Sequence, residues 1–371
     1  MSGELVIGAD RLVDGSGFDG PGWLSVRDGV VADRGTGTST APVDVQLGTV
    51  VPGFLDAHVH GAVGIDFGAL GADPSPAIAH HARTGSTTLV ASLATSALSI
   101  TVDRLRELAP VVRSGALAGL HLEGPFLASE RRGAHDPALL LAPDPAAVDA
   151  LLAAADGTLA MITLAPELPG AMQAIRRLTD SGVVVALGHT AATVEEMRRG
   201  IDAGATVITH VFNGMPSLHH RAPGPVGVAL TDERLTVEVI GDGHHLDDIA
   251  VDLVRSSARG RMTLVSDAMS ATGLGDGHYD LGSSSVVVEN GVASLADHSS
   301  LAGGTTPIGG AVTRLVRRGA DAVEVASLTS AAPARALGRR ASALTVGAPA
   351  DLVELGDDGV TRVMKAGAWL A

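Results

Sequence analysis

Residues 50–60 read VVPGFLDAHVH, an apolar run that ends in His58 and His60. Residues two apart on an extended strand point to the same face, so both imidazoles can reach one metal ion. Other apolar runs end in Glu123, His189, His210 and Asp267, each able to bind a metal or carry a proton. Buried strands that end in this way predict one site assembled from distant segments, with metal-assisted hydrolysis as its chemistry.

Between residues 51 and 344, strand-like apolar runs alternate with alanine-rich segments of helical pattern. This alternation is typical of a parallel sheet with crossover helices. The strand-like runs are residues 51–56, 87–92, 118–122, 159–164, 183–187, 206–209, 235–240 and 262–266. They predict an α/β fold, a (β/α)8 TIM-like barrel, whose active sites lie at the carboxyl ends of the strands. The six polar residues above are expected at that end.

Both ends of the chain have a different pattern, with short alternating strands separated by Gly and Asp-Gly turns. Short strands separated by such turns indicate antiparallel β-structure. We therefore expect residues 1–50 and 345–371 to form one small β-sandwich domain. The catalytic barrel, residues 51–344, would be inserted between these two segments.

The composition restricts the possible functions. The formal net charge of −15 argues against nonspecific binding of nucleic acid or of anionic membrane surfaces. The sequence has no cysteine, which excludes disulfides and thiolate metal ligands. No apolar segment is long enough to span a membrane, and the N-terminus does not resemble a secretory signal, so we expect a cytoplasmic protein.

Glu123, His189 and His210 together form a set that can hold catalytic zinc with one position open for water. A single histidine after a strand is more often structural, and an isolated HxH pair also arises by chance, so their combination indicates the metal. Asp267 would take a proton from metal-activated water and pass it to a leaving nitrogen. The alternative for Asp267 is a helix N-cap.

Longer motifs run in order through nearly the whole chain. They are PGFLDAHVHG, LHLEGPFL, RRGAHDP, ALGHTAAT, THVFNGMPSLHHRAPG, GDGHH, VSDAMSATG and SLAGGTTP. In these motifs the sequence resembles the amidohydrolase superfamily, and within it the N-acetylglucosamine-6-phosphate deacetylases. Many amidohydrolases bridge two metals with a carboxylated barrel lysine, but the only lysine here is Lys365, in the predicted β-domain. Glu123 is the natural substitute for such a bridge.

The resemblance implies a role for each matching residue. Glu123, His189 and His210 would hold the principal divalent ion, expected to be zinc, and His58 and His60 would form a second position. One or two ions per subunit are therefore expected. The implied catalytic residues are Asp267 and His135. The implied substrate contacts are Ala134, His135, Asn213, Gly214, Arg221, Asp242, Gly243, His244, His245, Leu301, Ala302 and Gly303.

Two of these positions carry further implications. The family commonly has alanine where this chain has Gly214, and a backbone contact should survive that difference. Arg221 resembles a phosphate-binding arginine that can reach across a dimer interface, so a homodimer is implied. A solvated surface arginine is the alternative for Arg221.

The activity implied by the resemblance is hydrolysis of the acetamide of N-acetyl-D-glucosamine 6-phosphate to D-glucosamine 6-phosphate and acetate. The alternatives are deacetylation of the galactosamine isomer or another amidohydrolase reaction, such as deamination of a ring. A non-catalytic sugar-phosphate sensor on a decayed barrel is a remoter alternative. Decay should first remove the metal ligands or the proton carrier, and all of them are present.

Overall fold

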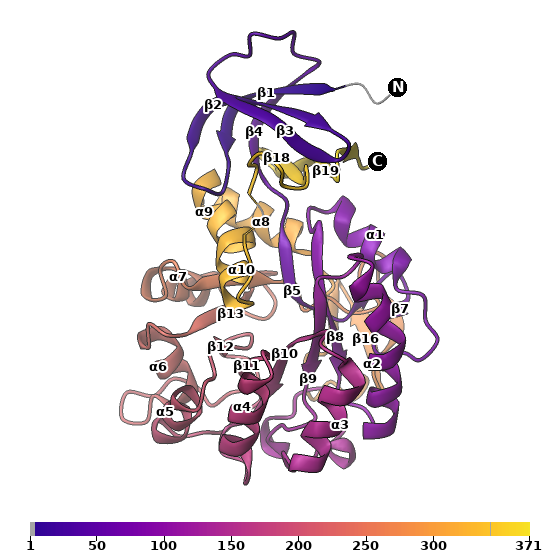
Figure 1. Cartoon of the computed structure of the whole chain (residues 1–371). Coiled ribbons are helices and arrows are strands. Elements are labelled where there is room, and N and C mark those ends of the chain that lie inside the picture. Colours follow the sequence, from indigo (N-terminus) through magenta and orange to yellow (C-terminus); the bar gives the residue numbers. More distant parts are fainter. Residues whose placement is uncertain (1–3, 342) are drawn as a thin grey trace. The chain divides into compact units, whose positions relative to one another are not determined.

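The computed structural model describes residues 4–341 and 343–371. Within these ranges, eight parallel strands form one sheet in the order β5-β8-β9-β10-β11-β12-β13-β14 (Figure 1). Their bounds are Leu55–Val59, Thr88–Ala94, Gly119–Glu123, Leu159–Leu164, Val184–Leu187, Val207–Ile208, Thr236–Ile240 and Met262–Val265. The sheet returns on itself, because the Asp267 N–H donates to the His58 carbonyl (2.9 Å) and the His60 N–H to the Ala268 carbonyl (2.8 Å). The predicted (β/α)8 barrel is confirmed.

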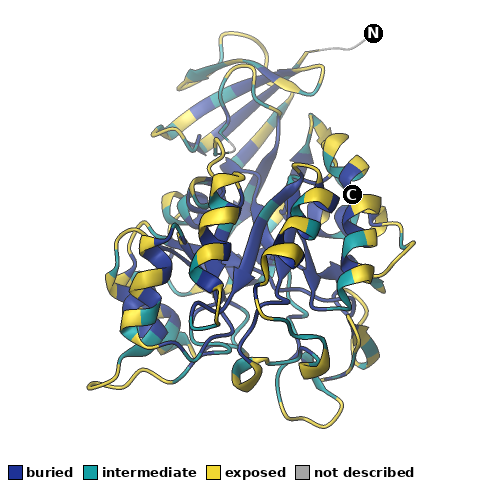
Figure 2. Cartoon of the chain, turned by 60° about the horizontal axis from the view of Figure 1, so that its bottom comes forward, coloured by how far each residue is buried: buried dark blue, intermediate teal, exposed yellow. Residues whose placement is uncertain are grey.

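Helices surround these strands. They are α1 (Ser75–Arg83), α2 (Leu98–Arg113), α3 (Pro145–Ala155), α4 (Ala171–Asp180), α5 (Val194–Asp202), α6 (Gly224–Thr231) and α7 (Asp248–Ser257). Helix α5 begins with a capping box, in which Thr193 and Glu196 satisfy each other's backbone N–H groups. Figure 2 shows buried strands inside the barrel and exposed residues on the outer faces of the helices. A helix whose apolar residues recur about every 3.6 positions buries one face and exposes the other in this way.

The first barrel strand begins later than predicted. Val51 and Pro52 end β4 (Val45–Pro52), where they pair with Val353 and Leu352 of β18. The barrel strand β5 starts at Leu55, so His58 lies inside the strand and His60 follows it. Because Val51 near the end of β4 and Leu55 at the start of β5 are both apolar and buried, the sequence pattern did not separate the two strands. The predicted strand at residues 51–56 is therefore wrong in its bounds.

Strands from both ends of the chain form a second sheet, in the order β20-β19-β18-β4-β1-β2-β3. Besides β4 these are β1 (Leu5–Val13), β2 (Asp19–Arg27), β3 (Val30–Thr36), β18 (Leu352–Gly356), β19 (Gly359–Lys365) and β20 (Ala368–Trp369). A buried apolar cluster joins the two ends, with Ile7, Leu24 and Val50 from one and Leu352 and Met364 from the other. The predicted small β-sandwich domain from both termini is confirmed.

The described chain divides into two compact units. One contains residues 4–56, 79–88, 307–341 and 343–371, and the other contains residues 57–78 and 89–306. The domain boundaries predicted at residues 50/51 and 344/345 stay a proposal about which segments fold as domains. Every residue of the candidate site described below belongs to the second unit.

After β14 the chain forms an antiparallel excursion of three strands. Its strands are β15 (Gly277–Leu281), β16 (Ser284–Glu289) and β17 (Val292–Leu295). Leu281, Val286 and Val288 pack in one buried cluster with Met269 and Ala302. This packing fixes Leu281 and the segment after β17, which line the pocket described below.

The remaining elements are short or lie near the C-terminus. They are the two-residue strands β6 (Gly61–Ala62) and β7 (Ile65–Asp66), the 3-10 turns η1 (Ser129–Arg131) and η2 (Pro137–Leu139), α8 (Ile308–Arg317), α9 (Ala322–Ala326), the π-helical turn η3 (Ser327–Ala331) and α10 (Ala332–Ala336). Among the described residues, no helix combines the length and the apolar character that crossing a membrane requires.

Candidate metal centre and active site

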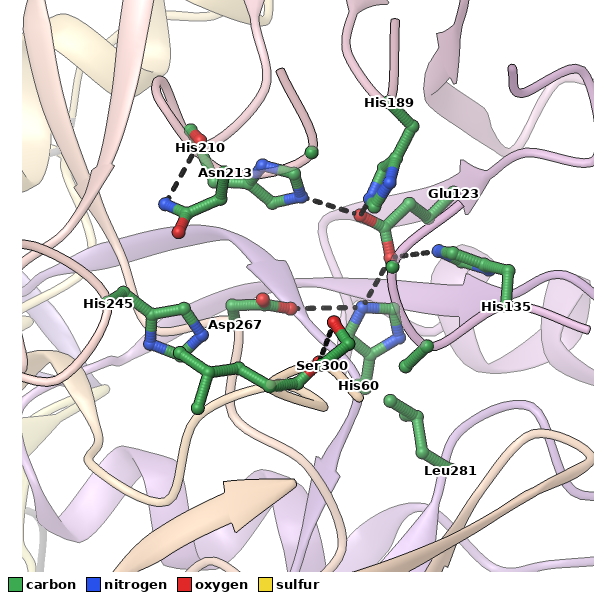
Figure 3. A pocket seen from close by; sticks show the side chains of 15 residues that line it. His60, Glu123, His135, His189, His210, Asn213, His245, Asp267, Leu281 and Ser300 are labelled. Carbon is green, nitrogen blue, oxygen red and sulfur yellow. Dashed lines mark hydrogen bonds and ion pairs between the residues drawn. The ribbon is translucent and has the colours of Figure 1, made fainter. Parts of the chain in front are cut away.

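The six polar residues that follow apolar runs converge at the carboxyl ends of the barrel strands. His58 and His60 come from β5 and its end, and Glu123 is the last residue of β9. His189, His210 and Asp267 each lie two residues beyond the end of β11, β12 and β14. Figure 3 shows five of them facing one pocket. All six side chains are buried.

The Glu123 carboxylate is the centre of this arrangement. Its Oε1 atom lies 3.0 Å from His189 Nε2 and 2.9 Å from His210 Nε2. Its Oε2 atom lies 3.1 Å from His60 Nε2. The two oxygens therefore face different histidines, as a carboxylate shared by two cations would.

The possible ligands form two groups that share Glu123. One group is Glu123, His189 and His210, and the other is His58, His60, Glu123 and Asp267. Within each group the ligand atoms lie within 4.8 Å of one another. His58 Nε2 is 3.2 Å from His60 Nε2 and 3.4 Å from Asp267 Oδ1. The geometry is compatible with one ion in each group.

The hydrogen bonds of two imidazoles direct their lone pairs into the site. His189 Nδ1 donates to the Arg131 carbonyl at 2.7 Å, and His58 Nδ1 donates to the Glu238 carboxylate at 3.2 Å. In a neutral imidazole the other nitrogen, Nε2, then carries a lone pair. Both Nε2 atoms face Glu123, so the donor set fits a borderline-soft divalent ion such as zinc.

The electrostatics of the site also favour a cation. Burial lowers the pKa of the His60 imidazole, but Asp267 and Glu123 raise it to about 9. Burial is likewise outweighed at His58, where the same two carboxylates raise the pKa well above its usual range. Burial raises the pKa of the Glu123 carboxyl, yet His58 and the other histidines lower it well below its usual range. In the metal-free protein, protons bound to the histidines therefore balance the negative charge of the carboxylates. A divalent ion would supply this positive charge instead.

Three of these residues have left-handed backbone conformations. The φ angles are +47° at His189, +23° at His210 and +49° at Asp267. Such conformations cost about 1–3 kcal/mol each in residues other than glycine, and they cluster at functional sites. Three of them around one carboxylate are a second indication, independent of residue type, that this is the active site.

Asp267 lies at the edge of the site, on the pocket side. Its Oδ1 atom is 3.2 Å from His60 Nε2. Burial raises the pKa of its carboxyl, but His58 and His60 lower it below its usual range, so the group is ionised. An ionised carboxylate that faces the cavity can accept a proton from a water held there.

His135 is placed to donate a hydrogen bond into the pocket. The Thr95 N–H donates to its Nδ1 at 3.3 Å, so the neutral imidazole carries its proton on Nε2. That Nε2 lies 3.4 Å from Glu123 Oε2. Burial lowers the pKa of His135, which keeps the ring neutral and its Nε2–H available for a developing negative charge.

The pocket has a volume of about 190 Å³. The residues that line it are His60, Glu123, Gly133, Ala134, His135, His189, His210, Asn213, Gly214, His245, Asp267, Leu281, Ser300, Leu301 and Gly303. Seven predicted substrate contacts are therefore brought together here: Ala134, His135, Asn213, Gly214, His245, Leu301 and Gly303. Gly214 has φ +61°, and a Cβ atom there would lie 2.8 Å from His189 Nδ1, so this backbone suits glycine.

The remaining predicted contacts lie outside the pocket lining. Asp242 accepts the N–H groups of His244 and His245, and its carboxylate pairs with His245 Nδ1 at 2.8 Å. Gly243 and Ala302 belong to the segments that carry lining residues. Arg221 is exposed, and its guanidinium lies 2.8 Å from His220 Nε2. Its predicted contact with a phosphate stays a prediction.

Sequence reasoning missed Glu238, Gly133, Leu281 and Ser300. Gly133, Leu281 and Ser300 line the pocket. Gly133 and Ser300 lie in the motifs RRGAHDP and SLAGGTTP beside predicted contacts, whereas Leu281 is the last residue of β15 and lies in none of the quoted motifs. Glu238 could have been identified from the sequence. It stands in the middle of the buried strand TVEVI, where a carboxylate is costly unless it is hydrogen-bonded.

Residues 49–370 match the sequence profile described as "Amidohydrolase family". The chain belongs to the amidohydrolase family. It is 38% identical over 340 residues to an N-acetylgalactosamine-6-phosphate deacetylase of Escherichia coli O157:H7, a match that covers 90% of this chain and 89% of the relative. It is 36% identical to the N-acetylglucosamine-6-phosphate deacetylase of Bos taurus, with 83% of this amidohydrolase and 80% of the relative covered.

A solved structure agrees with these relatives. The amidohydrolase superposes with a TM-score of 0.95 and 42% identity on a mutant N-acetyl-D-glucosamine-6-phosphate deacetylase from Mycobacterium smegmatis, in complex with N-acetyl-D-glucosamine-6-phosphate. The match covers 99% of each chain. The family and fold predicted from the sequence are confirmed. The roles of individual residues stay predictions.

Metal binding by the amidohydrolase is expected to release protons. In the metal-free protein the pKa of His60 is about 9, so below that pH the imidazole is protonated and must lose its proton before Nε2 binds an ion. The apparent affinity for Zn²⁺ should therefore rise from neutral pH toward pH 9, by up to about tenfold per pH unit for each proton displaced. Calorimetric titration in two buffers of different ionisation enthalpy measures this release. Equal enthalpies in both buffers would contradict the prediction, and His60→Ala should release fewer protons.

Proposed function

We propose that this amidohydrolase hydrolyses the acetamide of N-acetyl-D-glucosamine 6-phosphate to D-glucosamine 6-phosphate and acetate. One observation carries the proposal: Glu123, His189 and His210 lie around a pocket that also presents Asp267 and the Nε2–H of His135. The named relatives support the substrate class, since they are deacetylases of 6-phosphorylated N-acetyl amino sugars. Acetate release from this substrate, by protein of measured metal content, tests the proposal.

Glu123, His189 and His210 would hold the principal ion, with zinc as the proposed metal. His58 and His60 would help to hold a second ion beside Glu123, which gives one or two ions per subunit. A divalent ion bound here would supply a water of lowered pKa and polarise the acetamide carbonyl.

The protein's own groups would move the protons. Asp267 would accept a proton from the attacking water and return it to the amine nitrogen as the amide C–N bond breaks. The Nε2–H of His135 would donate to the carbonyl oxygen as negative charge develops there. The Thr95 N–H supports this role, because it keeps the His135 proton on Nε2, the nitrogen that faces Glu123.

The phosphate needs positive charge, yet none of the described pocket-lining residues is an arginine or lysine. Arg221 would supply this charge, either in its own subunit or across a homodimer interface. An arginine can bind a phosphate with two parallel hydrogen bonds. This arrangement would also direct the anionic substrate to a site on a protein of net charge −15.

Arg221→Ala is expected to raise KM for N-acetylglucosamine 6-phosphate by about 10- to 100-fold and to change kcat little, because hydrogen bonds to charged groups contribute about 1.5–3 kcal/mol. Steady-state kinetics measures this, with Arg259→Ala as an exposed-arginine control. Hydrolysis of unphosphorylated N-acetylglucosamine should be unaffected. An unchanged KM would contradict the role. If Arg221 acts across a dimer, mixing Arg221→Ala with Asp267→Asn should restore activity.

The galactosamine isomer is a second candidate substrate. It is favoured by the 38% identity to the Escherichia coli N-acetylgalactosamine-6-phosphate deacetylase. The two sugars differ in the orientation of one hydroxyl group, so kcat/KM for acetate release from each 6-phosphate decides between them. Release of ammonia from ring substrates would instead indicate a different amidohydrolase reaction.

The hypothesis of a non-catalytic sensor does not explain why the complete set of predicted metal ligands is present. The predicted ligands and the proton carrier are all present, and all of them except His58 line the pocket. A sensor would bind the phosphosugar without acetate release even when loaded with metal. The expected cytoplasmic location stays part of the proposal.

A further inference from the structure

Glu238 is the middle residue of β13, and its side chain contacts the ring of His58. Its neighbours Thr236, Val237, Val239 and Ile240 are all buried, and Glu238 itself is 1% exposed. A buried carboxylate needs hydrogen-bond donors to offset its lost hydration. The donors to Glu238 come from the segments that carry two of the predicted metal ligands.

The first donor is the ring of His58. Its Nδ1 lies 3.2 Å from Glu238 Oε2, while its Nε2 lies 3.4 Å from Asp267 Oδ1 and 3.6 Å from Glu123 Oε1. An ionised carboxylate only accepts hydrogen bonds, so it holds the proton of a neutral His58 on Nδ1. The Nε2 lone pair is thereby directed at the predicted ligand group.

The second donor is the backbone at His210. The His210 N–H lies 3.4 Å from Glu238 Oε2, and the Val211 N–H donates to the Glu238 carbonyl at 2.9 Å. His210 has a φ of +23°, a strained backbone conformation that these contacts help to hold. Glu238 therefore contacts the segments that supply ligands to both groups.

We propose that Glu238 is a positioning residue that orients His58, fixes its tautomer and so sets the affinity of the ion position shared by His58 and His60. This inference rests on the proposed metal site and extends it to a residue outside the pocket. Carboxylates that accept the second N–H of a ligand histidine raise its basicity, and their loss typically costs about 10- to 100-fold in metal affinity.

The test is a metal titration of stripped full-length protein, with Zn²⁺ or Co²⁺ as the probe. Glu238→Gln should weaken the ion position that depends on His58 by about 10- to 100-fold. Glu238→Asp, which keeps the charge on a shorter side chain, should have an intermediate effect and replaces the Gln variant if that one does not fold. Circular dichroism and thermal unfolding of the metal-free variants monitor the fold.

Glu167→Gln is the matched control. Glu167 is a half-buried carboxylate that follows the barrel strand β10, and it accepts the Thr190 hydroxyl and the Ala191 N–H. Its replacement removes the same charge without touching the hydrogen bond of His58. The affinity of the His58 position should stay at the wild-type value.

A double-mutant cycle separates positioning from a general structural effect. In a His58→Ala background, Glu238→Gln should weaken ion binding no further, because the ring through which Glu238 acts is gone. Wild-type affinity in the Gln variant would overturn the inference. The inference would also be overturned if Glu238→Gln weakened ion binding as much in the His58→Ala background as in the wild type. The same holds if the protein bound a single ion whose affinity neither substitution changed. Acetate release is assayed separately, so failure of the proposed reaction is distinguishable from failure of this inference.

Discussion

Glu123→Gln is expected to abolish ion binding and to lower kcat/KM for N-acetylglucosamine 6-phosphate by about 10³-fold or more, which corresponds to about 4 kcal/mol of transition-state stabilisation. Glu123 is the residue that belongs to both ligand groups. Its two oxygens lie within 3.1 Å of His60, His189 and His210. A neutral amide removes the negative charge and turns one acceptor atom into a donor that faces imidazole nitrogens.

Metal content after purification and acetate release together measure this effect. The matched control is Glu130→Gln, which removes an exposed carboxylate from the turn η1 and should retain metal and activity. A Glu123→Gln variant that keeps a full complement of metal would contradict the central role of this carboxylate. Restored activity at high Zn²⁺ concentration would indicate weakened binding and an intact reaction path.

Asp267→Asn is expected to retain metal while turnover falls by about 10²- to 10⁴-fold, the usual contribution of a general acid–base group. The carboxylate faces the pocket, and its ionised state suits it to accept a proton. The asparagine keeps the size of the side chain and its hydrogen-bonding reach but does not take up a proton at neutral pH. KM should change little, because the lost interaction belongs to the transition state.

Single-turnover acetate release by Zn²⁺-loaded protein measures the chemical step directly. Near-normal release by Asp267→Asn would contradict the assignment of Asp267 as the proton carrier. Loss of metal together with activity would instead identify Asp267 mainly as a ligand, in line with its distance of 3.2 Å from His60 Nε2. Metal analysis of the same preparation separates these outcomes.

The barrel and the ends of its strands could be predicted because their signals are local. Apolar runs of four to six residues, separated by segments of helical pattern, can be recognised from the periodicity of each segment alone. Glu123 at the end of β9 and Asp267 just after β14 were expected at the carboxyl edge for the same reason. The boundary at Pro52 could not be predicted, because Val51 before it and Phe54 and Leu55 after it are apolar and buried, and only the pairing of β4 and β5 separates these two strands.

The sequence by itself determined which residue types reach the carboxyl edge of the barrel, and the absence of a barrel lysine already pointed to Glu123 as the bridging group. Only the tertiary structure decided which Glu123 oxygen faces which histidine, and which buried acid supports His58. His58 and Glu238 are separated by 180 residues in the chain. Their contact depends on how the sheet closes, a long-range property that the periodicity of the separate segments does not contain.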